Sequence, residues 1–162
     1  MCSQEENAAP SLLADAMLGK LARWLRLLGY DTLYLQVDDA LLAHRARSEG
    51  RILLTRDREL VKRRGLHFLL ISSEILEEQL VQVLQAVGPP PEPAGPRCME
   101  CNTPLREIPL AEARSQVPIY VAQTQTEFRQ CPTCQRITWP GTHWDGIQQR
   151  LERVRDQLAG SK

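Results

Sequence analysis

Hydrophobic residues recur with two different periods along the first half of the chain. Between Met17 and Leu28 they stand three or four residues apart, and this spacing predicts an amphipathic helix that ends at Gly29. Helical patterns also cover a segment at 40–48, a basic stretch that ends at Arg64, and a segment at 75–87. Short apolar runs precede the helices and predict four strands, at 12–13, 32–37, 52–55 and 66–71. The alternation of strands and helices predicts an α/β fold, with a mainly parallel sheet flanked by helices.

The second half of the chain begins after a proline-rich segment. Five of the nine residues from Gly88 to Pro96 are proline, which excludes both helix interiors and central strands. Two short segments beyond it, 119–121 and 124–128, have a strand-like composition, and apolar residues from Ile147 to Leu158 give a last helix one face for packing on its own chain. We therefore predict a domain, a linker, a metal-binding module and a terminal helix, at 1–88, 89–97, 98–145 and 146–162.

Four of the five cysteines form two C-x-x-C pairs, Cys98 with Cys101 and Cys131 with Cys134. Such pairs present thiolates to one tetrahedral Zn²⁺, and four cysteine ligands leave no open coordination position for catalysis. The 29 residues between the pairs exceed the usual spacing, but the entropy of closing a loop grows only logarithmically with its length. We therefore expect a structural zinc ribbon, and a redox dithiol is the alternative.

Acidic residues follow three of the predicted strands. Asp15 ends the first strand, Asp38 and Asp39 follow the second, and Asp57 follows the third. Parallel strands present their carboxyl ends at one edge of the sheet, where ligands bind near the reversal of strand order. Carboxylates gathered there repel one another unless a hard cation such as Mg²⁺ or Mn²⁺ neutralises them, and metal-bound water can then attack a phosphodiester. The alternative is that Asp15, Asp38 or Asp39 only caps a helix.

These residues resemble the Mut7-C RNase domain family, which combines a PIN-like fold with an attached zinc ribbon. The resemblance rests most specifically on Ala14 to Arg26, which reads ADAMLGKLARWLR. It is also seen in Asp31, in the pair Asp38-Asp39, in LLTRD from Leu53 to Asp57, in the two cysteine pairs and in WPGTHW from Trp139 to Trp144. The likeness therefore covers nearly the whole chain.

The resemblance implies metal-dependent endonucleolytic cleavage of RNA. Asp15 matches the first-strand acid of PIN-like nucleases, and Asp39 matches the acid that precedes their alanine-rich helix. Thr55 and Asp57 match the hydroxyl and the acid of their T-x-D motif. Many PIN nucleases carry a further Glu between the first two acids, whereas Asp31 is the only acid within 16–37. Either Asp38 substitutes for that Glu, or the metal is held by fewer carboxylates.

Basic residues surround the predicted acidic edge. Residues 19–64 contain eleven basic and six acidic side chains, a balance that suits a polyanion such as RNA. Lys20, Arg23 and Arg26 are spaced by three along the first helix and could contact phosphates, as could Arg56 beside Asp57. The alternative for these side chains is a solvated helix face with ion pairs.

Aromatic residues follow the second cysteine pair. Trp139 and Trp144 could stack on bases, and His143 between them could contact a phosphate or a base. The alternative is that these residues pack over the ribbon and cover it.

Composition excludes several classes of protein. The charges cancel over the 162 residues, with 20 basic and 20 acidic side chains, so a uniformly basic nucleic-acid coat is excluded. A hydrophobic content of 43% is that of a globular protein rather than a disordered one. No apolar run approaches the roughly 18 residues of a membrane span. The first ten residues lack the basic and apolar regions of a secretory signal, so we expect a cytoplasmic location.

The sequence thus predicts a ribonuclease that uses Mg²⁺ or Mn²⁺ for cleavage, Zn²⁺ for structure and RNA as partner. Association with the ribosome or tRNA is compatible with this interpretation, and the oligomeric state is not predicted. The main alternative is a noncatalytic RNA-binding or ribosome-associated adaptor. A receiver-like or phosphatase-like domain is disfavoured, because the first acid is not part of a D-x-D pattern.

Overall fold

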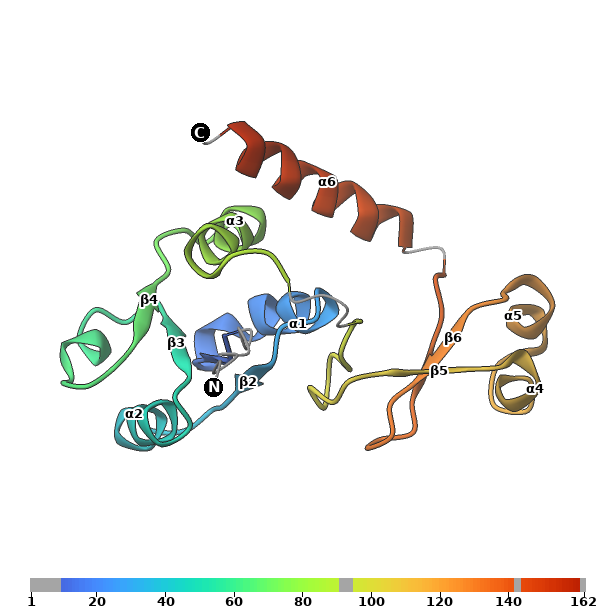
Figure 1. Cartoon of the computed structure of the whole chain (residues 1–162), viewed down its shortest axis with the longest axis horizontal. Coiled ribbons are helices and arrows are strands. Elements are labelled where there is room, and N and C mark those ends of the chain that lie inside the picture. Colours follow the sequence, from blue (N-terminus) through green and yellow to red (C-terminus); the bar gives the residue numbers. More distant parts are fainter. Residues whose placement is uncertain (1–9, 91–94, 142–143, 161–162) are drawn as a thin grey trace, which may run out of the picture.

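The computed structural model describes residues 10–90, 95–141 and 144–160. Its first half contains a four-stranded sheet made of β1 (Leu12–Ala14), β2 (Thr32–Tyr34), β3 (Ile52–Thr55) and β4 (Phe68–Leu70). The strands lie in the order β2-β1-β3-β4, and every neighbouring pair is parallel. The predicted α/β fold with a parallel sheet is therefore confirmed (Figure 1).

Helices cover both faces of this sheet. They are η1 (Ala16–Leu18), α1 (Gly19–Leu27), α2 (Asp39–Ser48), η2 (Leu60–Lys62) and α3 (Leu76–Val87). Neighbouring strand residues point to opposite faces. Leu12 and Leu54 therefore share a core cluster with α1 and α3, whereas Leu13 and Leu53 share another with α2 and η2.

Three details of the predicted helices are wrong. Met17 is 67% exposed, because it lies in the short turn η1 ahead of α1 and off its apolar stripe. Ile75 is exposed as well, since α3 begins only at Leu76. The basic stretch forms no helix beyond η2, because the backbone turns extended at Arg63.

The second half contains a three-stranded antiparallel sheet in the order β5-β6-β7, made of β5 (Arg106–Ile108), β6 (Phe128–Gln130) and β7 (Ile137–Thr138). The helices α4 (Leu110–Ala113) and α5 (Ile119–Thr124) lie between β5 and β6. The prediction of a strand at 119–121 is wrong, and the strand predicted at 124–128 is present only from Phe128 onward. Of the three residues predicted as a strand, Val121 is buried in the small core, and Ile119 and Tyr120 are exposed on the short helix α5.

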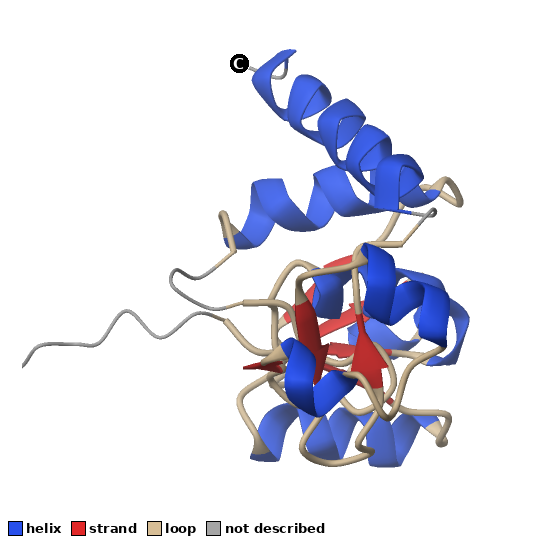
Figure 2. Cartoon of the chain, turned by 90° about the vertical axis from the view of Figure 1, so that its right-hand side faces the viewer, coloured by secondary structure: helices blue, strands red, loops and turns tan. Residues whose placement is uncertain are grey.

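The last helix, α6 (Trp144–Gly160), runs back from the antiparallel sheet and lies over α3 (Figures 1 and 2). Val154 is 1% exposed and belongs to the same core cluster as α1 and α3. Glu77 on α3 forms ion pairs with Arg150 at 3.2 Å and Arg153 at 2.9 Å. The amphipathic terminal helix thus packs on its own chain and completes the core of the first half.

The first cysteine pair is attached to the parallel sheet. Asn102, directly after Cys101, accepts a hydrogen bond from the Thr32 amide at 3.0 Å and donates one to Asp31 at 2.7 Å. The Arg97 amide donates to the Arg26 carbonyl at 2.9 Å. These contacts cross the predicted linker, so the independent folding of residues 1–88 stays a prediction. Within the described residues, no helix combines the length and apolar character needed to cross a membrane.

Candidate active site and metal centre

The first candidate site lies where the order of the parallel strands reverses. The chain passes from β1 to β2 on one side and then crosses β1 to form β3 on the other. In such sheets, ligands bind outside the carboxyl ends of the strands on either side of the reversal. Asp15 directly follows β1, Thr55 ends β3, and Asp57 lies two residues further on.

Hydrogen bonds join these three residues into one chain. Asp15 is 7% exposed, and its Oδ1 accepts a bond from the Met17 amide at 3.0 Å. The buried hydroxyl of Thr55 donates to Asp15 Oδ2 and accepts a bond from the Asp57 amide at 3.0 Å. Thr55 thereby fixes the orientation of Asp15 and the start of the loop that carries Asp57.

Asp57 itself is half-buried and organises that loop. Its Oδ1 accepts hydrogen bonds from the amides of Glu59 at 2.8 Å and Leu60 at 3.3 Å, at the start of η2. Both donors are neutral backbone amides, so neither of these bonds pairs the carboxylate with a cation.

Asp38 and Asp39 take different positions. Asp38 caps α2, because its Oδ1 accepts a bond from the Leu41 amide at 2.8 Å, and Asp39 is exposed in the first turn. Among the described residues, the cysteines are the only group of three or more potential metal ligands close enough to share an ion. The acids therefore lie at one edge of the sheet without forming a closed cluster, and shared binding of Mg²⁺ or Mn²⁺ by Asp15, Asp39 and Asp57 stays a prediction.

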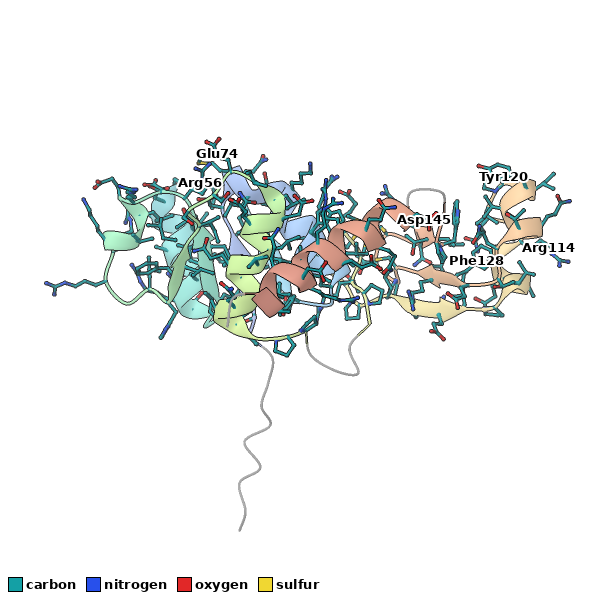
Figure 3. The ribbon with its side chains drawn as sticks, turned by 90° about the horizontal axis from the view of Figure 1, so that it is seen from above. Arg56, Glu74, Arg114, Tyr120, Phe128 and Asp145 are labelled. Carbon is teal, nitrogen blue, oxygen red and sulfur yellow. The ribbon has the colours of Figure 1, made fainter. Side chains whose placement is uncertain are left out.

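A fifth carboxylate at this edge is not among the predicted site residues. Glu74 follows β4, and its Oε1 accepts a hydrogen bond from Arg56 Nη1 at 3.3 Å (Figure 3). Its position shortly after a strand was the available signal, the same one that identified the other acids. The predicted phosphate contact Arg56 is thus paired with an exposed acid that a phosphate could replace.

The four cysteines form the second candidate site. Their Sγ atoms all lie within 4.8 Å of one another, and Cys98 and Cys134 are 3.9 Å apart. Sulfur atoms bound to one tetrahedral zinc would lie about 3.8 Å apart, given a Zn–S distance of about 2.3 Å. The sulfur positions and the all-thiol donor set therefore fit Zn²⁺.

The two cysteine pairs have the same backbone geometry. Asn102 and Gln135 each follow a pair and adopt left-handed backbone, with φ of 64° and 65°. Each amide donates to the carbonyl of the first cysteine of its pair at 2.9 Å. Because both loops form the same turn, their four sulfur atoms gather around one point.

Comparison with known proteins gives one match. A model of the Mut7-C RNAse domain family matches residues 10–151, which include both candidate sites. The chain belongs to the Mut7-C RNAse domain family. No curated protein and no solved structure matches it. The family description supports a ribonuclease-related function for this Mut7-C domain.

Arg26 of the Mut7-C domain is not placed for the phosphate contact that its spacing suggested. Its side chain is buried, Nε donates to the Thr32 carbonyl at 2.8 Å, and Nη1 donates to the Met99 carbonyl at 2.7 Å. Burial lowers the pKa of Arg26, and nearby Cys98 and Glu100 act against that shift. Arg26 thus joins the first cysteine pair to the parallel sheet.

Lys20 and Arg23 do lie on the exposed face of α1. Arg23 forms an ion pair with Glu100 at 2.9 Å, in which both side chains are about half exposed. Exposed ion pairs of this kind contribute little stability, so a phosphate can replace the carboxylate at small cost. His143 lies outside the described residues.

Proposed function

We propose that this Mut7-C domain is a metal-dependent endoribonuclease whose cleavage site is the acidic edge of the parallel sheet. The observation that carries the proposal is the hydrogen-bonded chain of Asp15, Thr55 and Asp57 at the reversal of strand order, in a member of an RNase family. Asp15 and Asp57 would hold Mg²⁺ or Mn²⁺, with Asp39 or Asp38 as a further ligand across the edge. Oxygen ligands of this kind suit both ions.

The residues at this edge have different proposed roles. Thr55 orients Asp15, so the carboxylate meets its ligand without first having to be ordered. Lys20, Arg23 and Arg56 would neutralise substrate phosphates on either side of the acids. When bound, the metal supplies an activated water and stabilises negative charge on the phosphate. The zinc ribbon contacts Arg23 on α1 through Glu100, and we propose that it assists RNA binding.

The test is cleavage of end-labelled single-stranded RNA by the full chain with Mg²⁺ or Mn²⁺. Asp15→Asn should lower the rate by roughly 100-fold or more, because loss of a ligand is at least as damaging as loss of its orienting partner. The matched control is Asp156→Asn, which changes an exposed acid on α6 and should leave the rate unchanged. Internal cuts would support endonucleolytic action. RNA binding without metal-dependent cleavage would favour a noncatalytic adaptor.

A further inference from the structure

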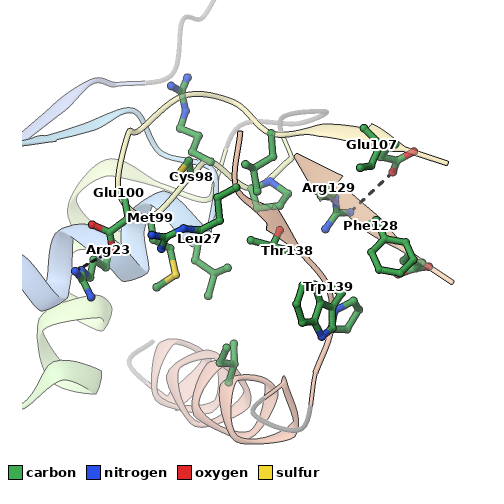
Figure 4. A pocket seen from close by; sticks show the side chains of 18 of the residues that line it. Arg23, Leu27, Cys98, Met99, Glu100, Glu107, Phe128, Arg129, Thr138 and Trp139 are labelled. Atoms are coloured by element: carbon green, nitrogen blue, oxygen red, sulfur yellow. Dashed lines mark ion pairs between the residues drawn. The ribbon is translucent and has the colours of Figure 1, made fainter. Parts of the chain in front are cut away.

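A cavity of about 600 Å³ lies between α1, the first cysteine pair, the antiparallel sheet and the start of α6. Arg23 and Leu27 line it from α1, Met99 from the first cysteine pair, and Arg129, Arg136 and Trp139 from around β6 and β7. Figure 4 shows Met99 and Trp139 on opposite sides of it. Its volume is typical of a ligand site rather than of a packing defect.

The walls combine the two kinds of side chain that bind single-stranded nucleic acid. Trp139 is half-buried and supplies a large aromatic surface on which a base can stack. Its ring rests against Phe128, with ring centres 6.4 Å apart and planes tilted by 58°. The Trp139 ring is therefore held in place before any ligand arrives, which lowers the entropy cost of stacking.

The arginines around the cavity can reach a phosphate backbone. Arg23 and Arg129 are paired with the exposed acids Glu100 and Glu107, at 2.9 Å and 4.0 Å. Arg136 is exposed at the rim. Arginine binds phosphate by two parallel hydrogen bonds and also stacks on bases, so this set suits a nucleotide better than an uncharged ligand.

The cavity is connected to the acidic edge by α1. This helix begins at Gly19, four residues after Asp15, and Arg23 lies one turn further, about 6 Å along the axis. Lys20 is exposed between them. One side of α1 thus leads from the proposed cleavage site to the cavity, and its last residue, Leu27, forms part of the wall.

We propose that this cavity binds an unpaired base of single-stranded RNA, beside Trp139, while a phosphate a few nucleotides along the same strand lies at the acidic edge. The inference rests on the proposed function and adds the substrate class to it. A base inside a duplex is stacked on both sides and cannot enter the cavity. RNA with an unpaired segment next to the cut is therefore the preferred substrate.

The test measures affinity for a short oligouridine RNA by fluorescence anisotropy, with the full zinc-loaded chain carrying Asp15→Asn to separate binding from cleavage. Trp139→Ala should weaken binding roughly 10-fold, and Trp139→Phe should restore most of it, because one stacked base is lost and then regained. A duplex RNA of equal length should bind equally to all three proteins. Equal affinity of Trp139→Ala and its parent for oligouridine would overturn the proposal.

Trp139 also packs against the small core, so its replacement can disturb the fold. A second variant therefore changes a cavity residue outside that core. Arg136→Ala should lower the slope of log affinity against log salt by about 0.7. The control is Arg114→Ala, an exposed arginine at the far end of the ribbon (Figure 3), which should leave the slope unchanged. Equal slopes for the two variants would contradict a phosphate contact at the cavity.

Crosslinking locates the base directly. Bromouridine RNA irradiated on the full chain should crosslink to Trp139 or Met99, and crosslinks found only outside the cavity would overturn the proposal. The experiments distinguish failure of the base-binding cavity from failure of the cleavage site. Cavity variants that bind normally, with cleavage still lost in Asp15→Asn, would remove only this subsite. Weakened binding in Trp139→Ala, with normal cleavage by Asp15→Asn, would remove only the cleavage site.

Discussion

Asp15 and Asp31 lie at opposite ends of the same parallel sheet, and their surroundings differ. Asp15 follows β1, and among the described residues its hydrogen-bond donors are neutral, the Met17 amide and the Thr55 hydroxyl. Asp31 precedes β2 and accepts bonds from Arg51 at 2.9 Å and from Asn102 at 2.7 Å. Asp31 is thus paired with an arginine, whereas these hydrogen-bond partners of Asp15 include no cation.

Asp15 is therefore suited to binding a cation, whereas Asp31 supports the fold. At the amino edge, Arg51 also donates to the Leu12 carbonyl at 3.1 Å, so one arginine fastens the starts of three strands. Asn102 adds the first cysteine pair to this network. The carboxyl edge has no such arginine on Asp15 among the described residues, which leaves its negative charge to attract a metal ion.

Loss of zinc should lower the stability of the protein more than the other changes below. The first cysteine pair holds Asn102, which is bonded to the amino edge of the parallel sheet. Four thiolates without a cation repel one another, and zinc binding is coupled to folding of its loops. We expect Cys131→Ser to unfold the antiparallel sheet and to lower the free energy of unfolding of the parallel sheet as well. Hydrogen exchange at the Thr32 and Leu53 amides measures the second effect. Unchanged protection at both amides would show that the two halves are energetically independent.

Thr55→Val should reduce cleavage in a chain that still folds, since the lost hydrogen bonds lie at the carboxyl edge alone. The substitution keeps the shape of the side chain but removes the hydroxyl between Asp15 and Asp57. Loss of an orienting partner costs about 10- to 100-fold in activity or metal affinity. Thr55→Ser keeps the hydroxyl and should retain most of the activity in the same assay. If Val and Ser behave alike, the hydrogen-bonded chain has no role in catalysis.

The sequence predicted one of these edges better than the other. Asp15 and Asp57 were identified because a strand ends where its apolar run ends, and parallel strands share an edge. Asn102 was not identified, because its partner Asp31 is 71 residues away and neither residue type reveals the pairing. Arg26 was misplaced for the same reason, since its partner Met99 lies 73 residues further along.

Asn102→Gly tests the amino edge with a smaller change. Glycine keeps the left-handed backbone after Cys101 but removes the bonds to Thr32 and Asp31. We expect a loss of about 1 to 3 kcal/mol in the free energy of unfolding, because a buried amide and a carboxylate lose partners. Gln135→Gly is the matched control, since Gln135 has the same backbone after the other pair and its side chain donates to the nearby Pro132 carbonyl. Equal losses in urea unfolding would assign the effect to the turn itself.

The smallest expected effect is on acid stability. Burial alone would raise the pKa of Asp31, but hydrogen bonds from Arg51 and Asn102 outweigh it and lower the pKa below its ordinary 3.8. Asp31 therefore adds stability above pH 3.8 that is lost as the pH falls through its folded-state pKa. The stability difference between the wild type and Asp31→Asn should shrink below that pH in urea titrations. A difference that stays constant with pH would contradict the ion pair.

Titration of the zinc-loaded chain with Mn²⁺, followed by NMR, tests the central claim most directly. A paramagnetic ion broadens the signals of nearby amides, so it reports which end of the sheet binds the cation. We predict earlier and stronger broadening at the Met17, Asp57 and Glu59 amides than at the Thr32 and Asn102 amides of the opposite edge. Asp15→Asn should abolish the effect. Broadening that begins equally at both edges, or that persists in Asp15→Asn, would contradict a metal-dependent cleavage site at the carboxyl edge.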